Sequence, residues 1–279
     1  MPIALDAMKF EALRVESTGA VLQITLNRPE SRNAMSMQMV AELRQVLEAA
    51  ESTVGQGDAV RVVVLRGEGG HFCAGADLKD MAAARMRAMQ DPNPQSDVIA
   101  EVSQGFGQLC VAYANTPLAL VIVLEGTVMG GGFGLACVAD VVIASNTVQF
   151  RLPETSLGVI PAQIAPFLVE RLGYSQARRL AVTGARVLAP QALALGLVHT
   201  VCNAEDLQAE VDSVVAQILG CAPGALAQTK ALMARARLEA PQALVADAAT
   251  MFSRSTQGAE GLEGMTAFIQ KRKPQWALP

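Results

Sequence analysis

The segment Leu118–Leu124, with the sequence LALVIVL, leads shortly into the glycine run GGGFG at positions 130–134. The first stretch is continuously apolar and rich in β-branched residues, which is typical of a strand buried on both faces. Glycine lets a ligand approach main-chain N–H groups closely, and the helix expected from about Phe133 to Ala139 points its positive dipole end at the same place. A tight turn with close helix packing would need fewer glycines than these. The sequence therefore predicts a strand, a ligand-facing turn and a helix.

A second strand-to-helix turn lies earlier in the chain, in the sequence FCAGADL at positions 72–78. It follows the β-branched run Val60–Leu65, and Asp77 can cap a helix that runs towards Met89. A plain helix cap explains this segment when it is taken alone. Two such turns, however, both offer bare backbone N–H groups, and two donors aimed at one point can hold a developing oxyanion. Neither turn has the sequence of a phosphate loop or of a dinucleotide-binding fingerprint.

Glu154 is the candidate acid/base residue. It follows Pro153 in a stretch rich in apolar side chains, which disfavour the charged form of a carboxyl group and raise its pKa towards the range useful for proton transfer. A solvated loop residue, or a salt bridge to Arg151, fits the local sequence equally well. Together with the two turns, Glu154 indicates chemistry on a thioester enolate. A serine hydrolase is disfavoured because the chain lacks a Gly-x-Ser-x-Gly nucleophile elbow.

Strand-like and helix-like segments alternate up to about residue 200, which predicts an α/β fold with parallel strands covered by helices. From about Tyr174 onwards β-branched runs mostly vanish and helical patterns dominate. We therefore expect an α/β core over residues 1–200 and a helical C-terminal region over residues 201–279. The expected strands are 13–16, 21–26, 60–65, 118–124 and 141–144, and the expected helices are 37–51, 77–89, 98–113, 133–139, 176–183, 190–195, 204–219, 224–238, 241–254 and 260–271.

Composition excludes several classes of protein. The chain has 279 residues, is 51% hydrophobic and has a net charge of −4, which gives no electrostatic footprint for nucleic acid. Its longest apolar stretch, Pro117–Ala144, contains Glu125, Asp140 and five glycines, so we do not expect a membrane span. Five scattered cysteines indicate core thiols, with neither a disulfide framework nor metal-ligand spacing. The first residues lack a secretory signal pattern, and we expect a cytoplasmic location.

Two minor features remain open at the level of sequence. His71 adjoins the 72–78 turn and either lines the site or is a polar turn residue. The basic run Lys271-Arg272-Lys273 near the C-terminus is either a solvated helix end or a grip for a polyanionic ligand.

Several motifs, in this order, resemble the enoyl-CoA hydratase/isomerase (crotonase) superfamily over nearly the whole chain. They are LNRP at 26–29, Asn33-Ala34, FCAGADL at 72–78, the glycine triplet at 130–132, Pro153-Glu154 with Leu157-Gly158, and GMTAF at 264–268 with the basic run at 271–273. The resemblance implies a spiral of ββα units with a helical C-terminal trimerisation region. It also implies a homotrimer or dimer of trimers, acyl-CoA as the ligand and no metal or redox cofactor, because coenzyme A is part of the substrate.

The resemblance also implies roles for individual residues. The N–H groups of Ala76 and Gly131 would form the oxyanion hole, and Glu154 would act as the acid/base. Phe268 and Lys271 would reach the CoA bound by a neighbouring subunit, where phosphates need to be neutralised. The remaining residues expected to contact substrate or CoA are Arg32, Ala34, Ala74, Asp77, Leu78 and Gly134.

One departure from the family pattern matters. Crotonyl-CoA hydratases carry a glutamate shortly after the glycine triplet, where this chain has Gly134, so only Glu154 remains. This fits Δ3-Δ2-enoyl-CoA isomerases, and it also fits hydratases of branched glutaconyl-CoA esters. The segment 157–168 is similar to methylglutaconyl-CoA hydratases and more so to isohexenylglutaconyl-CoA hydratases of acyclic terpene breakdown.

We therefore expect a hydratase, with Gly134 leaving room for a branch at C3 and the substrate's distal carboxylate taking part. An isomerase using Glu154 alone, an acyl-CoA hydrolase, and a non-catalytic CoA- or RNA-binding scaffold are the alternatives. Residues 80–110 are expected to form a lid over the acyl pocket, with a break at 91–94.

Overall fold

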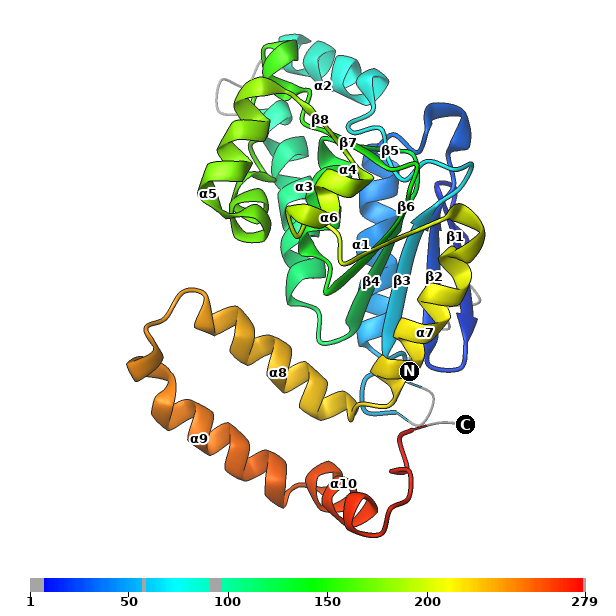
Figure 1. Ribbon diagram of the computed structural model, residues 1–279. Helices are drawn as coiled ribbons and strands as arrows, with labels where there is room; N and C mark the ends of the chain where they lie inside the picture. The colour runs from blue at the N-terminus through cyan, green and yellow to red at the C-terminus, as the bar shows by residue number, and fades with distance from the viewer. Residues whose placement is uncertain (1–7, 57–58, 91–96, 278–279) are drawn as a thin grey trace.

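A six-stranded sheet forms the centre of the protein, with strand order β1-β2-β3-β4-β6-β9 (Figure 1). This computed structural model describes residues 8–56, 59–90 and 97–277. The hairpin β1–β2 is antiparallel and every other neighbouring pair in this sheet is parallel. The strands are β1 (Leu13–Thr18), β2 (Val21–Leu26), β3 (Val62–Gly67), β4 (Ala119–Leu124), β6 (Val141–Ser145) and β9 (Thr200–Cys202).

Both faces of the central strands β3, β4 and β6 are largely buried, as the continuous apolar runs predict. On one face Leu22, Ile24 and Leu65 join the main core with helix α1 (Met37–Glu51). On the other face Val62, Val121 and neighbouring residues pack against Leu207 and Val211 of α7 (Leu207–Leu219). Helix α7 therefore packs on the sheet and is part of the α/β core. The helical region that lies apart from the sheet begins after α7.

A second, three-stranded sheet was not expected from the sequence. It consists of β5 (Thr127–Met129), β7 (Gln149–Arg151) and β8 (Arg186–Leu188). Strands of three residues are too short to show a period of two, so pattern analysis passes over them. This small sheet matters for the site because β5 leads into the glycine turn and β7 leads into Glu154.

Helices cover the upper part of the molecule in Figure 1. They are α2 (Leu78–Gln90), α3 (Val98–Asn115), α4 (Gly131–Val138), α5 (Ala165–Thr183) and α6 (Ala189–Ala194). The short helix α4 packs between α3 and α5. Helix α5 starts well before the expected residue 176, with Gly173 at φ +70° interrupting it. The expected break at 91–94 lies outside the described residues.

The last three helices form an arm that extends away from the sheet (Figure 1). They are α8 (Pro223–Ala236), α9 (Pro241–Gln257) and α10 (Ala259–Ile269). Arg61, just before β3, holds the base of the arm by donating hydrogen bonds to the carbonyls of Leu219, Cys221 and Trp276, at 2.9, 2.6 and 2.7 Å. Among the residues that the structure describes, no helix is both long enough and apolar enough to cross a membrane.

Candidate active site

The two turns singled out in the sequence meet in the structure. Cys73 and β5 exchange backbone hydrogen bonds, with Cys73 N–H donating to Thr127 O at 3.0 Å and Met129 N–H donating to Cys73 O at 2.9 Å. A Cβ on Gly130 would lie 3.6 Å from Gly75 Cα. Gly75 and Gly130 have φ angles of +95° and +48°, so both turns use conformations that favour glycine.

Ala76 and Gly131 each present an N–H group at this junction. Ala76 lies between two hydrogen bonds to Met35, which leave its own N–H facing the other way: Met35 N–H donates to Gly75 O at 2.7 Å and Asp77 N–H donates to Met35 O at 3.0 Å. Gly131 is the first residue of α4, where a helix has no acceptor for its N–H. Neither N–H donates a backbone hydrogen bond within the described residues. Two backbone N–H groups without a backbone acceptor therefore lie on these adjoining turns.

Glu154 lies against the same turn. It begins the 3₁₀ helix η3 (Glu154–Leu157), and its Oε1 would be 3.1 Å from a Cβ on Gly130. Its Oε2 is buried and has no hydrogen-bond partner among the residues that the structure describes. Desolvation raises the pKa of Glu154 above its ordinary value of 4.5, although a backbone hydrogen bond partly opposes the shift. A half-buried carboxyl group with one unpartnered oxygen, close to two backbone donors, is suited to proton transfer.

Close packing fixes the two turns relative to each other. A Cβ on Gly132 would lie 2.6 Å from Cys73 Cβ, so glycine is needed for this approach. A Cβ on Gly131 would lie 3.0 Å from Cζ of Phe106, which places this α3 side chain beside Gly131. Phe106 carries no motif of its own and was missed in the sequence.

A loop after β2 brings three of the expected CoA-contact residues together. Ala74 N–H donates to Arg32 O at 2.9 Å, and Ala34 O accepts from the Arg28 guanidinium at 2.7 Å. Asn33 is fully buried, and its amide donates to the carbonyls of Glu68 and His71. Arg32 has an exposed side chain beside this loop, as a phosphate contact requires.

The contacts of Asp77 are those of a structural residue. Its carboxylate forms an ion pair with Arg28 at 2.8 Å and accepts a 2.9 Å hydrogen bond from Lys79 N–H. Burial alone would raise the pKa of Asp77, but the Arg28 and backbone hydrogen bonds outweigh it and lower the pKa. Asp77 thus stays ionised and holds the start of α2, where Leu78 is 76% exposed.

His71 is a turn residue with a defined partner. Its Nδ1 accepts a 3.1 Å hydrogen bond from Thr127 N–H, which ties the 72–78 turn to β5. The ring therefore supports the backbone of the site.

Gly134 does not open onto free space, contrary to expectation. A Cβ at this position would collide with Cγ2 of Ile164, a side chain only 3% exposed. The sequence showed the missing glutamate but could not show that a residue thirty positions later fills its place. The expected room for a branch next to Gly134 is therefore absent.

Phe268 belongs to α10 and Lys271 follows that helix, and Figure 1 shows α10 at the opposite end of the molecule from α4 and β7. Phe268 is 85% exposed and Lys271 is also exposed. Within one chain the structure does not bring them to the turns.

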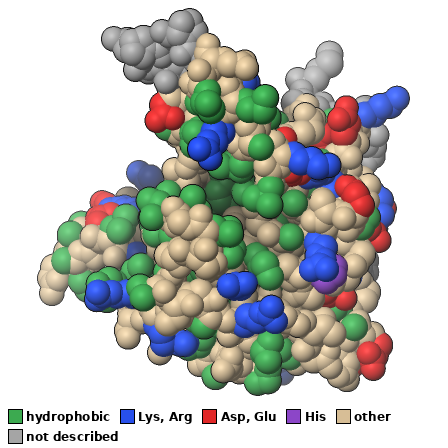
Figure 2. All heavy atoms as spheres, turned by 90° about the horizontal axis from the view of Figure 1, so that it is seen from above, with side chains coloured by type: hydrophobic (Ala, Val, Ile, Leu, Met, Phe, Trp, Pro, Cys, Tyr) green, Lys and Arg blue, Asp and Glu red, His purple; other side chains and the backbone are tan. Residues whose placement is uncertain are grey.

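Hydrophobic side chains gather around a hollow on the upper face of the molecule, which carries α2 (Figure 2). Large apolar side chains are exposed on α2 and just after Glu154: Leu78, Met81, Met86, Met89, Leu157, Val159 and Ile160. Such a surface suits an acyl chain better than a polar ligand.

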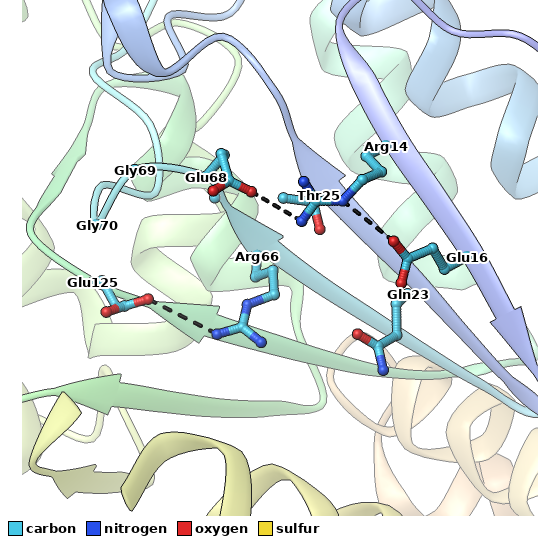
Figure 3. A pocket seen from close by; sticks show the side chains of 10 residues that line it. Arg14, Glu16, Gln23, Thr25, Arg66, Glu68, Gly69, Gly70 and Glu125 are labelled. Carbon is cyan, nitrogen blue, oxygen red and sulfur yellow. Dashed lines mark ion pairs between the residues drawn. The ribbon is translucent and has the colours of Figure 1, made fainter. Parts of the chain in front are cut away.

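A different groove, of about 310 Å³, lies over β1, β2 and β3 (Figure 3). Its lining includes two arginines and three glutamates, and Arg14 pairs with Glu68 at 2.9 Å while Arg66 approaches Glu125 at 3.9 Å. Since acidic groups outnumber basic ones, this groove does not favour a polyphosphate. It contains none of the expected site residues.

Comparison with known proteins gives a consistent result. The sequence profile of the family "Enoyl-CoA hydratase/isomerase" matches residues 16–278. A 2,3-dehydroadipyl-CoA hydratase of Escherichia coli is 31% identical over 92% of this chain and 94% of its own length. A mevalonyl-coenzyme A hydratase of Aspergillus fumigatus is 30% identical over 93% of this chain and 92% of its own length.

Solved structures agree in fold. AtuE of Pseudomonas aeruginosa is 50% identical with a TM-score of 0.90, over 96% of this chain and 100% of that one. An enoyl-CoA hydratase/isomerase of Marinobacter aquaeolei is 47% identical with a TM-score of 0.90, over 96% and 99%. The predicted α/β architecture with a helical C-terminal region is thereby confirmed.

Proposed function

The chain belongs to the enoyl-CoA hydratase/isomerase family, and on that premise we propose that it adds water across the C2–C3 double bond of a branched glutaconyl-type CoA thioester. Isohexenylglutaconyl-CoA and 3-methylglutaconyl-CoA are the proposed substrates. The observation that carries the proposal is the buried, unpartnered Oε2 of Glu154 beside two free backbone donors.

The proposed reaction uses one carboxylate for both proton transfers. The thioester oxygen accepts hydrogen bonds from the N–H groups of Ala76 and Gly131. Ionised Glu154 removes a proton from a water molecule, whose oxygen bonds to C3 while the C2–C3 π electrons pass to the thioester oxygen as an enolate. The enolate then takes the proton from Glu154 at C2, which restores the thioester carbonyl. The hole stabilises the enolate because its donors are fixed before charge develops.

Two lines of support favour a branched or dicarboxylic acyl group. The segment 157–168 resembles the hydratases of branched glutaconyl esters. Among the relatives, the E. coli protein is named for a dehydroadipyl ester, which is dicarboxylic, and the A. fumigatus protein for a mevalonyl ester, which is branched.

The arm supports a proposed assembly into a homotrimer or a dimer of trimers. Phe252, Phe268 and Ile269 are 72%, 85% and 78% exposed, which is costly for side chains of this size unless another surface covers them. In the proposed assembly, Phe268 and Lys271 contact the CoA bound by a neighbouring subunit. Because the proposed reaction needs only proton transfer and oxyanion stabilisation, we propose that it uses no metal or redox cofactor. A cytoplasmic location remains a prediction from the sequence.

A mass-resolved assay tests the proposed reaction. The purified protein is incubated separately with isohexenylglutaconyl-CoA, 3-methylglutaconyl-CoA, crotonyl-CoA and a 3-enoyl-CoA, with Glu154→Gln as the comparison. We expect a glutaconyl ester to gain one water with the wild type and not with the variant. Absence of hydration of both glutaconyl esters would overturn the proposal.

The second candidate is a Δ3-Δ2-enoyl-CoA isomerase. It is favoured by the contact between Ile164 and Gly134, which leaves Glu154 as the only expected carboxylate at the reacting carbons. Glu154 would then move one proton between C2 and C4. Conversion of the 3-enoyl ester at unchanged mass, without hydration, would identify this activity. Release of free CoA thiol would instead reveal an acyl-CoA hydrolase.

A further inference from the structure

Gln163 and Ser103 form a polar pair next to the candidate site. Gln163 lies between η3 and α5, and its Nε2 donates a 3.0 Å hydrogen bond to Ser103 Oγ of α3. The rest of the Gln163 side chain lies over Gly107, one turn further along α3, where a Cβ would collide with Oε1. The pair is partly buried and joins helix α3 to the loop before α5.

The neighbours of this pair connect it to the oxyanion hole. Phe106, on the same helix as Ser103, lies against Gly131. Ile164, the residue after Gln163, lies against Gly134 of α4, the helix that begins with Gly131. The two residues that contact α4, Phe106 and Ile164, are thus close neighbours of Ser103 and Gln163 along the chain.

The pair has more hydrogen-bond donors than its own bond uses. A glutamine amide has two N–H donors, and a serine hydroxyl has one O–H donor besides its acceptor sites. One amide N–H is used by Ser103 Oγ. Within the described ranges, the second N–H of Gln163 and the O–H of Ser103 donate to no protein acceptor. Two neutral donors, held side by side, match the two oxygens of a carboxylate.

We propose that Gln163 and Ser103 bind the distal carboxylate of a dicarboxylic acyl thioester and so determine which acyl group is selected. This inference rests on the proposed hydratase function and names two residues that recognise the acyl group of its substrate. The bond between the two side chains fixes their donors before the substrate arrives, which reduces the entropy lost on binding. Hydrogen bonds to a charged group are worth more than neutral ones, so each lost donor is expected to lower kcat/KM for a diacid about 10- to 100-fold.

The test compares two esters that differ at the distal group alone. These are 3-methylglutaconyl-CoA and 3-methylpent-2-enoyl-CoA, in which a methyl replaces the carboxylate. The measured quantity is kcat/KM for the diacid ester divided by kcat/KM for the methyl ester. We expect Gln163→Leu and Ser103→Ala each to lower this ratio by about 10- to 100-fold. Gln163→Glu should lower it further, because two carboxylates repel. The effects of Gln163→Leu and Ser103→Ala should combine non-additively, since each removes the other's partner.

Two glycines of α3 supply a matched control. Gly107→Ala should displace the Gln163 amide and reduce the preference for the diacid. Gly105→Ala adds the same methyl group on the same helix, where no atom lies within 4 Å, and should retain the wild-type preference.

Equal losses of kcat/KM for both esters would overturn the proposal, because they would mean that the two side chains only maintain the structure of the site. Unchanged ratios in all three site variants would also overturn it. Failure of the hydratase proposal itself is distinguishable: if the wild type turns over neither ester, calorimetry with Glu154→Gln still compares their affinities. Tighter binding of the diacid that is lost in Gln163→Leu would support the carboxylate site, and equal affinities would refute it.

Discussion

Ile164 occupies the volume that a side chain at Gly134 would need. Its Cγ2 lies where a Cβ on Gly134 would point, and Ile164 belongs to the main core. A family position that elsewhere holds a second glutamate is therefore closed by an apolar side chain from another segment. In the proposed reaction, Glu154 therefore carries out both proton transfers.

The first prediction concerns this contact. Gly134→Ala should overpack the core and lower the free energy of unfolding by about 1–3 kcal/mol. Ile164→Ala should itself cost about 2–5 kcal/mol, but the double variant should cost less than the sum, because each change relieves the other. Denaturant unfolding of the four proteins measures the coupling. Strict additivity would contradict the contact, and Gly105→Ala on α3 is the control for adding a methyl to a helical glycine.

The second prediction tests the Gly131 N–H as a hydrogen-bond donor. Proline is tolerated at the first position of a helix because its missing N–H has no helical acceptor. Gly131→Pro should therefore preserve α4 while lowering kcat about 10²–10³-fold through loss of one oxyanion donor. Gly131→Ala keeps the N–H and adds only the Cβ that presses on Phe106, so its loss should be smaller. Circular dichroism confirms folding, and similar losses in both variants would contradict the hole assignment.

The third prediction is a pH dependence. Burial raises the pKa of Glu154 above 4.5, so the base form is lost at a higher pH than for an exposed glutamate. We expect the acidic limb of kcat/KM to lie above pH 4.5. The same shift has a stability consequence: the folded pKa exceeds the unfolded one, so stability falls as pH rises from 4.5 through the folded pKa. Glu154→Gln should accordingly gain thermal stability over the wild type across that window, and a constant difference with pH would argue against desolvation of this carboxyl group.

A fourth prediction concerns the arm. Arg61 donates to three carbonyls at its base, so Arg61→Gln should leave acceptors unpaired and destabilise the arm by about 1–3 kcal/mol. If the arm mediates assembly, light scattering should show partial dissociation at low protein concentration. Arg14→Gln is the matched control, since Arg14 is half exposed and its surface ion pairs contribute little. An unchanged oligomeric state and melting temperature in Arg61→Gln would contradict the predicted role.

Long elements with strong periodicity were predictable from the sequence. Helix α1 was predicted at its observed bounds, and β2 likewise, because their apolar residues repeat over several turns or along a full strand. The three-residue strands β5, β7 and β8 carry no such repeat and were missed. They form by pairing with partners distant in sequence, which no local pattern reports.

The candidate site was predictable where glycines or motifs mark it and not where packing defines it. The two turns and Glu154 are conspicuous because their backbones need unusual conformations or their surroundings are apolar. Phe106, Gln163 and Ile164 are ordinary residues of a helix and a loop. Their importance comes from what they contact across the fold, and the expectation about Gly134 was wrong for this reason.

Cys73 has a consequence for the fate of the acyl group. Its thiol lies behind Gly132, close to the turn expected to hold a thioester, and thiolates readily take acyl groups from thioesters. Burial raises the pKa of Cys73 to about 11. At neutral pH only about one thiol in ten thousand is then ionised, which suppresses self-acylation of the enzyme. In the proposed reaction, the acyl group would therefore stay on coenzyme A, even with a cysteine behind the glycine turn.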